Sequence, residues 1–132
     1  GIADFFLNLP NMPEDFVPYW DMKAPGVDGL QSHVAVDSVP RDASAAALIA
    51  SGLYELCTYI TPEKGKRYKS IADKIVGNLG RHYQAEPGTH YGFLLLHSTG
   101  HHPGGSEIDV PLNYADYFYL EALARKEALD NQ

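Results

Sequence analysis

The sequence contains a single cysteine, Cys57, and this scarcity excludes an internal disulfide framework. Cys57 lies among apolar residues of an expected helix, where a buried, inert thiol is a more ordinary role than that of a nucleophile. Basic residues are also few, since ten Lys and Arg against seventeen Asp and Glu give a net charge of −7. Nucleic acids and anionic membrane surfaces are bound through basic patches, so this charge argues against either as a partner.

Long apolar runs are missing as well. No run approaches the roughly 18 residues that a transmembrane helix needs, so no membrane span is expected. The first residues, G-I-A-D-F-F-L, lack the basic start and long apolar core of a signal peptide. What is present is an ordinary globular composition, 45% hydrophobic and 20% charged, at the length of one domain.

Hydrophobic periodicity predicts three helices, over residues 42–61, 62–83 and 110–128. The first nine residues have the character of the last turns of a further apolar helix that ends near Pro10. Each helix is expected to bury one apolar face. The buried residues of the first are expected to be Ala46, Ile49, Leu53, Leu56 and Ile60, and those of the second Tyr68, Ile71, Ala72, Ile75 and Leu79. Those of the third are expected to be Leu112, Ala115, Tyr119, Ala122 and Leu123.

The ends of these helices also carry signals. Asp42 or Ser44 is the expected N-cap of the first, and Asp109 is the expected N-cap of the last. The Ala-rich stretch 45–52 lets another helix approach closely, which is typical of an inner helix, and residues 125–132 have the character of a charged tail. Residues 91–96 fit a short strand or an extended segment.

The most polar stretch is residues 97–109, H-S-T-G-H-H-P-G-G-S-E-I-D, in which five of thirteen residues are His, Glu or Asp. Its glycines and proline predict a loop, and a polar loop between core-directed elements is a common place for binding groups. There is no H-E-x-x-H and no cysteine pair, so a zinc site is not expected. Ser98 and Ser106 lack the G-x-S-x-G context of a hydrolase nucleophile.

Two further observations bear on carbohydrate chemistry. Glycoside hydrolysis needs a pair of carboxylates, and the available acids are Asp21, Asp42, Glu107 and Asp109, two of which have alternative roles as helix caps. The single tryptophan, Trp20, stands in V-P-Y-W-D within the irregular, proline-rich segment 10–41. Its ring suits either a core anchor or a stacking surface for a sugar, and both interpretations stay open.

Three blocks carry a family resemblance: L-P-N-M-P-E-D-F-V-P-Y-W-D-M-K-A-P, P-R-D-A-S-A-A-A-L-I-A-S-G-L-Y-E-L and L-L-H-S-T-G-H-H-P-G-G-S-E-I-D-V-P-L-N-Y-A-D-Y-F-Y-L-E-A-L. In this order they resemble the C-terminal part of unsaturated glucuronyl hydrolases, glycoside hydrolase family 88. The related unsaturated rhamnogalacturonyl hydrolases, family 105, share the fold and the closing block, whereas P-Y-W-D and S-T-G-H-H-P are more similar to family 88.

The resemblance implies an all-α fold, the C-terminal portion of an (α/α)6 toroid of helical hairpins, with residues 1–132 as a single incomplete domain. It implies removal of a 4,5-unsaturated uronic acid from the non-reducing end of oligosaccharides released by polysaccharide lyases, with no metal or organic cofactor. An aspartate of the family protonates the C4=C5 bond and assists water attack at C5. Those aspartates lie in the N-terminal half of full-length members, so no catalytic residue is assigned here and the chain alone is expected to be inactive.

The resemblance implies that the residues of this chain contact the substrate. Trp20 would stack near the sugar, Arg41 would pair with a carboxylate, and the rim of the pocket would be lined by Ser98, His101, His102 and Ser106. The rival interpretation is a non-catalytic helical module or remnant, whose Ala-rich face associates with a second copy or with the missing part of the domain, or a family 105-like portion. The expected location is the cytoplasm or periplasm of a bacterium.

Overall fold

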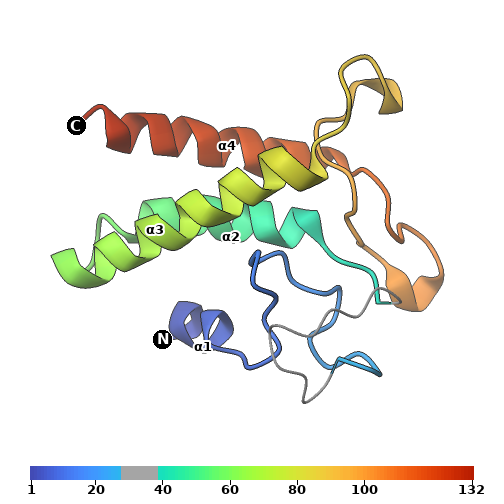
Figure 1. Ribbon diagram of the computed structural model, residues 1–132, viewed down its shortest axis with the longest axis horizontal. Coiled ribbons are helices and arrows are strands. Elements are labelled where there is room, and N and C mark those ends of the chain that lie inside the picture. The colour runs from blue at the N-terminus through green and yellow to red at the C-terminus, as the bar shows by residue number, and fades with distance from the viewer. Residues whose placement is uncertain (28–38) are drawn as a thin grey trace.

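The computed structural model describes residues 1–27 and 39–132, and this part of the chain is helical, without a strand. Three long helices, α2 (Ala43–Leu56), α3 (Pro62–Asn78) and α4 (Asn113–Asp130), follow a short one, α1 (Ile2–Leu7) (Figure 1). The helices expected from periodicity are thereby confirmed, as is the all-α class. Residues 91–96 form no strand; a single turn at His90–Gly92 (η2) is followed by extended backbone with one isolated bridge between Gln84 and Leu95.

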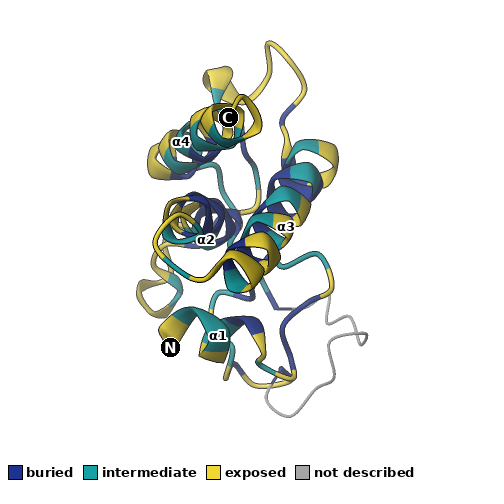
Figure 2. Cartoon of the chain, turned by 90° about the vertical axis from the view of Figure 1, so that its left-hand side faces the viewer, coloured by how far each residue is buried: buried dark blue, intermediate teal, exposed yellow. Residues whose placement is uncertain are grey.

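Helix α2 is the inner helix, as its small residues predict. It packs against both α3 and α4, and most of its residues are buried (Figure 2). Arg125 on α4 donates to the carbonyl oxygen of Ser51 at 2.8 Å, and the hydroxyl of Ser51 donates to Glu121. The close approach rests on alanines that are 0% exposed: Ala43, Ala46, Ala47 and Ala50.

This burial corrects one expectation. The Ala-rich stretch 45–52 was expected to offer an exposed face to a second copy, but the chain's own α3 and α4 pack against α2. Within the stretch, Leu48 is the large apolar side chain that remains exposed. The other strongly exposed ones lie outside it: Ile2, Phe5, Tyr59, Tyr91, Tyr117 and Leu120. The buried alanines of this stretch therefore serve packing within the chain.

Helix α3 is the outer helix. Tyr68, Ala72 and Ile75 are buried, and its basic residues face outward. The chain continues from α3 into a π-helical turn, Leu79–Tyr83 (η1), so the long helix expected over residues 62–83 is confirmed with a change of winding in its last turn. Of the other residues expected in the core, Ile49, Leu56, Ile60 and Ile71 are half-buried against it.

Helix α1 has only six residues and would not be stable alone. Its single acidic residue, Asp4, accepts hydrogen bonds from Lys64 at 2.6 Å and from Tyr68 at 2.8 Å, both on α3. These contacts, with the buried side chain of Leu7, attach α1 to the helical layer.

Helix α4 differs from the expectation at both ends. It begins at Asn113 with Leu112 as its N-cap, so the prediction that Asp109 caps it was wrong. It continues to Asp130, whose carboxylate lies 2.7 Å from Lys69, and the expected charged tail is therefore mostly helix. Leu123, expected in the core, is 36% exposed.

Among residues 1–27 and 39–132, no helix combines the length and apolar character needed to cross a bilayer.

Candidate functional site

The candidate site lies at the N-terminal end of α2, where α3 ends and α4 begins (Figure 1). Asp42 caps α2 as expected, since its Oδ1 accepts from the backbone N–H of Ser44 at 3.0 Å. The same carboxylate accepts from the N–H of Thr99, and the N–H of Ala43 donates to the carbonyl of His97 at 2.9 Å. The start of the inner helix thereby holds the polar loop 97–109 in place.

The loop after α1 reaches the same place from the other side. Trp20 donates its backbone N–H to the carbonyl of Pro40 at 3.0 Å, and Asp42 donates its own to Pro18 at 2.9 Å. Tyr19 and Arg41 form an isolated antiparallel bridge. Two segments that are about 80 residues apart in the sequence, around Trp20 and around residue 100, therefore converge on one helix start.

Trp20 and His102 are stacked. Their ring centroids lie 4.2 Å apart and the planes differ by 7°, which joins the two segments through an aromatic pair. Trp20 also packs, half-buried, on a small apolar cluster that includes Tyr19, Ala24 and Val27. The ring thus has a core side and a stacking side, and His102 occupies the latter in this structure.

The polar loop is closed by its own backbone. Ser98 and Val110 exchange two hydrogen bonds, of 3.0 and 2.9 Å, and Gly100 donates to the carbonyl of Glu107 at 2.8 Å. The short turn at its tip is His102–Gly104 (η3). A Cβ at position 100 would lie 2.4 Å from a carboxylate oxygen of Glu107 and 2.6 Å from the hydroxyl of Tyr114, so a larger residue there would displace these side chains.

Two expected site residues meet at this tip. Nδ1 of His101 lies 3.3 Å from Oγ of Ser106, and the two residues form a backbone bridge. Both are exposed, as residues of a rim must be. Ser98 differs: it is 0% exposed, its Oγ has no hydrogen-bond partner among the described residues, and it lies beneath the loop rather than on its rim.

Arg41 is held by a network that the sequence did not reveal. Its Nη2 lies 3.1 and 3.2 Å from the two carboxylate oxygens of Asp15, and its Nη1 donates to the carbonyl of Val17. Its guanidinium also lies over the ring of Tyr19, 4.9 Å from the centroid. Tyr83, from the π-turn, donates to Asp15 at 2.8 Å. Burial raises the pKa of Tyr83, and the hydrogen bond to Asp15 adds to the effect.

His97 and Asp109 pair across the base of the loop, with Nδ1 and Oδ1 2.7 Å apart. The rings of Tyr83 and His97 form a T-shaped pair, with their centroids 5.9 Å apart. Within the described part of the chain, no three His, Cys, Asp or Glu side chains gather closely enough to hold a metal ion.

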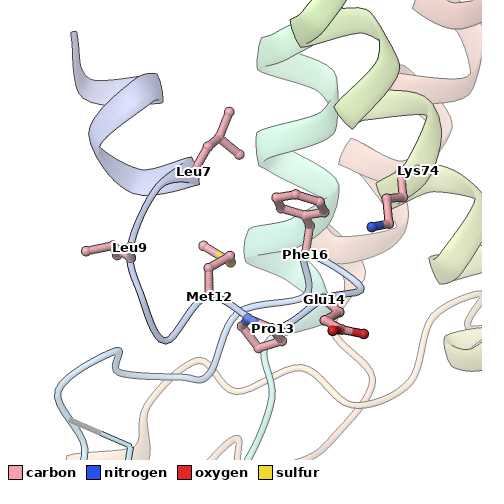
Figure 3. Close-up of a pocket in the computed structure, with 7 residues that line it drawn as sticks. All are labelled: Leu7, Leu9, Met12, Pro13, Glu14, Phe16 and Lys74. Carbon is pink, nitrogen blue, oxygen red and sulfur yellow. The ribbon is translucent and has the colours of Figure 1, made fainter. Parts of the chain in front are cut away.

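An open pocket of about 440 Å³ lies away from these residues, between the segment after α1 and α3 (Figure 3). Glu14 and Lys74 are its charged members, its other lining residues are of apolar type, and none of the six expected site residues lines it. It is formed by Leu7, Leu9, Met12, Pro13, Glu14, Phe16 and Lys74.

Known proteins with a similar sequence identify a group of enzymes that this chain resembles. No family model matches the chain. The unsaturated glucuronyl hydrolase of Formosa agariphila is 40% identical over 128 residues, which cover 96% of this chain and 29% of that protein. The unsaturated chondroitin disaccharide hydrolase of Streptococcus pneumoniae is 31% identical over 127 residues, 95% of this chain and 29% of that protein.

Solved structures give the same result for the fold. An unsaturated glucuronyl hydrolase specific for heparin superposes with a TM-score of 0.87 at 43% identity, over 99% of this chain and 33% of that one. The enzyme from Bacillus sp. GL1 gives 0.79 at 32% identity, over 96% of this chain and 31% of that one. These neighbours are (α/α)6 toroids, so the four helices here have the fold of about a third of such a toroid. The chain is therefore a partial homologue of the unsaturated glucuronyl hydrolases, matching 29–33% of their length with nearly all of its own.

Proposed function

We propose that this chain is the C-terminal part of a hydrolase that removes a 4,5-unsaturated uronic acid from the non-reducing end of lyase-generated oligosaccharides. The observation that carries the proposal is the match of almost the whole chain, at up to 43% identity, to unsaturated glucuronyl hydrolases and unsaturated chondroitin disaccharide hydrolases. A streptococcal relative has been solved in complex with dGlcA-GalNAc6S, and another relative with dGlcA-Glc-Rha-Glc.

The reaction is a hydration followed by bond cleavage. A proton adds to C4 of the C4=C5 bond and a water molecule adds its oxygen to C5 and loses a proton, which gives a hemiketal at C5. The bond from C5 to the ring oxygen then breaks to leave a ketone at C5, and the hemiacetal that remains at C1 collapses to an aldehyde and releases the rest of the oligosaccharide as an alcohol. This chemistry needs a carboxylic acid at the double bond. The resemblance puts the catalytic aspartates in the N-terminal half of full-length members, so we assign the proton donor to the rest of the protein. In the described part of this chain, Asp42 caps a helix and Asp109 pairs with His97, which agrees with structural roles for these two acids.

The contribution of this chain is to hold the substrate. The Trp20–His102 pair supplies an aromatic surface beside the start of α2, and aromatic faces suit the apolar faces of sugar rings. His101 and Ser106 supply polar groups at the loop tip, and Arg41 supplies a cation for a uronate carboxylate. Ser98 supports the loop from below.

The test uses the full-length protein that carries this chain. An unsaturated glucuronyl disaccharide is the substrate, and the loss of the ultraviolet absorbance of its conjugated double bond measures turnover. We expect Trp20→Ala to raise KM about tenfold, because about 1.4 kcal/mol of binding energy corresponds to that factor. Trp20→Phe should retain most of the affinity. The matched control is Tyr59→Ala, which removes an aromatic side chain that is 75% exposed and far along the chain from the site.

Two results would contradict the proposal. A folded full-length protein that leaves the unsaturated disaccharide unchanged would remove the assigned activity. A preference for an unsaturated rhamnogalacturonyl disaccharide would move the protein to the related family 105 activity.

The second candidate is a module that acts by association, with a second copy or with the rest of the domain. It is favoured by apolar side chains that are exposed in the isolated chain, above all Ile2 at 90% and Phe5 at 71% on α1. Light scattering of the isolated chain should then give a dimer or a larger assembly, and Phe5→Ser should shift it toward the monomer. A monodisperse monomer at high concentration would exclude association with a second copy.

A further inference from the structure

We infer that Asp15 is a positioning residue, which acts through Arg41 to orient a guanidinium for the carboxylate of the substrate. The inference rests on the proposed function, and it assigns a role to a residue of the irregular segment after α1. The evidence is the set of contacts that Asp15 makes with three different segments.

Asp15 has each of its acceptor atoms engaged. Oδ1 accepts from the backbone N–H of Val17 at 3.0 Å and lies 3.2 Å from Nη2 of Arg41. Oδ2 lies 3.1 Å from the same Nη2 and accepts from the hydroxyl of Tyr83 at 2.8 Å. The backbone carbonyl accepts from the side-chain amide of Asn78 at 3.1 Å. These hydrogen bonds fix the position of the Asp15 carboxylate, and the guanidinium of Arg41, which is paired with it, is therefore also held in place.

The partners on α3 and its π-turn are themselves fixed. Asn78 is 9% exposed and ends α3, and Tyr83 is 9% exposed and ends the π-turn. Because burial raises the pKa of Tyr83, its hydroxyl remains protonated and serves as a donor to Asp15. A π-turn often occurs at functional sites, and here it places Tyr83 against Asp15.

The side chain held by these contacts is that of Arg41. It immediately precedes Asp42, the N-cap of α2, and its side chain is 27% exposed, so it is accessible at the candidate site. Asp15, the carbonyl of Val17 and the ring of Tyr19 restrain the guanidinium. A restrained arginine loses less conformational freedom when it binds a carboxylate than a mobile one does.

The experiment compares two ligands in the full-length protein that carries this chain. One is the unsaturated glucuronyl disaccharide, and the other is its methyl ester, in which the negative charge is removed and one methyl group is added. Calorimetry measures the dissociation constant of each ligand for wild type, Asp15→Ala, Asp15→Asn, Arg41→Ala and the double variant, with KM and kcat measured in parallel.

We expect Asp15→Ala and Arg41→Ala each to weaken binding of the acid by about tenfold, since the contact is a charge-assisted hydrogen bond. The double variant should be no worse than Arg41→Ala, because one residue acts through the other. Binding of the methyl ester should change by less than about twofold. Asp15→Asn, whose single carbonyl oxygen can still accept from the N–H of Val17 and whose amide can donate to the hydroxyl of Tyr83, should recover part of the affinity and hold KM closer to wild type, with kcat little changed.

The outcomes separate the inference from the proposed function. Equal losses for the acid and the ester would mean that Asp15 only holds the loop, and would overturn the inference. Loss of acid binding in Arg41→Ala but not in Asp15→Ala would also overturn it, while leaving the proposed function intact. If the wild-type protein turns over neither ligand, the proposed function itself fails. A thermal unfolding curve for each variant, with Tyr83→Phe as a milder disruption of the same network, identifies any that fail to fold.

Discussion

His97 and Asp109 lie twelve residues apart, and Nδ1 of the first is 2.7 Å from Oδ1 of the second. Both residues have a left-handed backbone, with φ of 63° and 52°. The pair lies beside the two backbone hydrogen bonds between Ser98 and Val110, so it fastens the base of the polar loop.

We expect Asp109→Ala to lower the free energy of unfolding by about 1–2 kcal/mol, because alanine is disfavoured at positive φ and the pair is lost. Asp109→Asn should cost less, since asparagine tolerates this conformation and can still accept a hydrogen bond. Urea unfolding of the two variants measures the difference. Equal losses would show that neither the backbone conformation nor the acceptor matters here.

The contact of Gly65 with the preceding turn gives a second prediction. A Cβ at Gly65 in α3 would lie 2.6 Å from the carbonyl oxygen of Cys57, so Gly65→Ala should destabilise the chain by about 1–3 kcal/mol. Gly52 in α2 is the matched control, because a Cβ there meets nothing within 4 Å. Gly52→Ala should stabilise the chain by about 0.5–1 kcal/mol through helix propensity. Opposite signs in thermal unfolding are the expected result, and a neutral Gly65→Ala would contradict the close approach.

The attachment of α1 to α3 predicts a pH dependence. Hydrogen bonds from Lys64 and Tyr68 lower the pKa of Asp4 to about 2, from an ordinary value of 3.8. A lowered folded-state pKa means that the charged form stabilises the fold above pH 3.8 and that this contribution is lost as the pH falls toward 2. Wild type should therefore be more stable than Asp4→Asn near neutral pH, and the difference should shrink between pH 4 and pH 2. A difference that is independent of pH in that window would exclude Asp4 as its source.

Tyr54 offers a test of the polar contacts at the far end of the helices. Its side chain is 1% exposed, and its hydroxyl donates to Asp73 on α3 at 2.7 Å. Burial raises the pKa of Tyr54, and the hydrogen bond to Asp73 raises it further, so it acts as a donor. Tyr54→Phe should lower the free energy of unfolding by about 1–2 kcal/mol. Tyr59→Phe, at a position 75% exposed, should be neutral, and a similar loss in both variants would contradict a specific role for the bond.

The parts of the fold that could be predicted from the sequence are those governed by local physics. Helix periodicity located α2, α3 and α4, and the Asp42 cap followed from the side chain's reach to Ser44 two residues on. The start of α4 could not be predicted in this way. Asp109 has the residue type of a cap, but its carboxylate bonds to His97 instead, and that choice depends on how the loop closes.

The candidate site shows the same division. The aromatic and histidine residues were expected from their types, and the stacking of Trp20 on His102 brings two of them together. Asp15 and Tyr83 went unnoticed because their importance arises from a contact across 68 residues, which leaves no periodic signal. The burial of Ser98 was missed for a different reason, since loop residues are ordinarily exposed.

The polar loop has a consequence for how specificity can change. Its base is fixed by Ser98, Val110 and the start of α2, whereas residues 101–106 at its tip bond mainly to one another. Apart from the stacking of His102 on Trp20, the tip can therefore vary while the contacts that hold its base stay the same. The base of the loop is thus the constant part and its tip the variable part. Natural variation in substrate preference is expected to concentrate in the six positions 101–106.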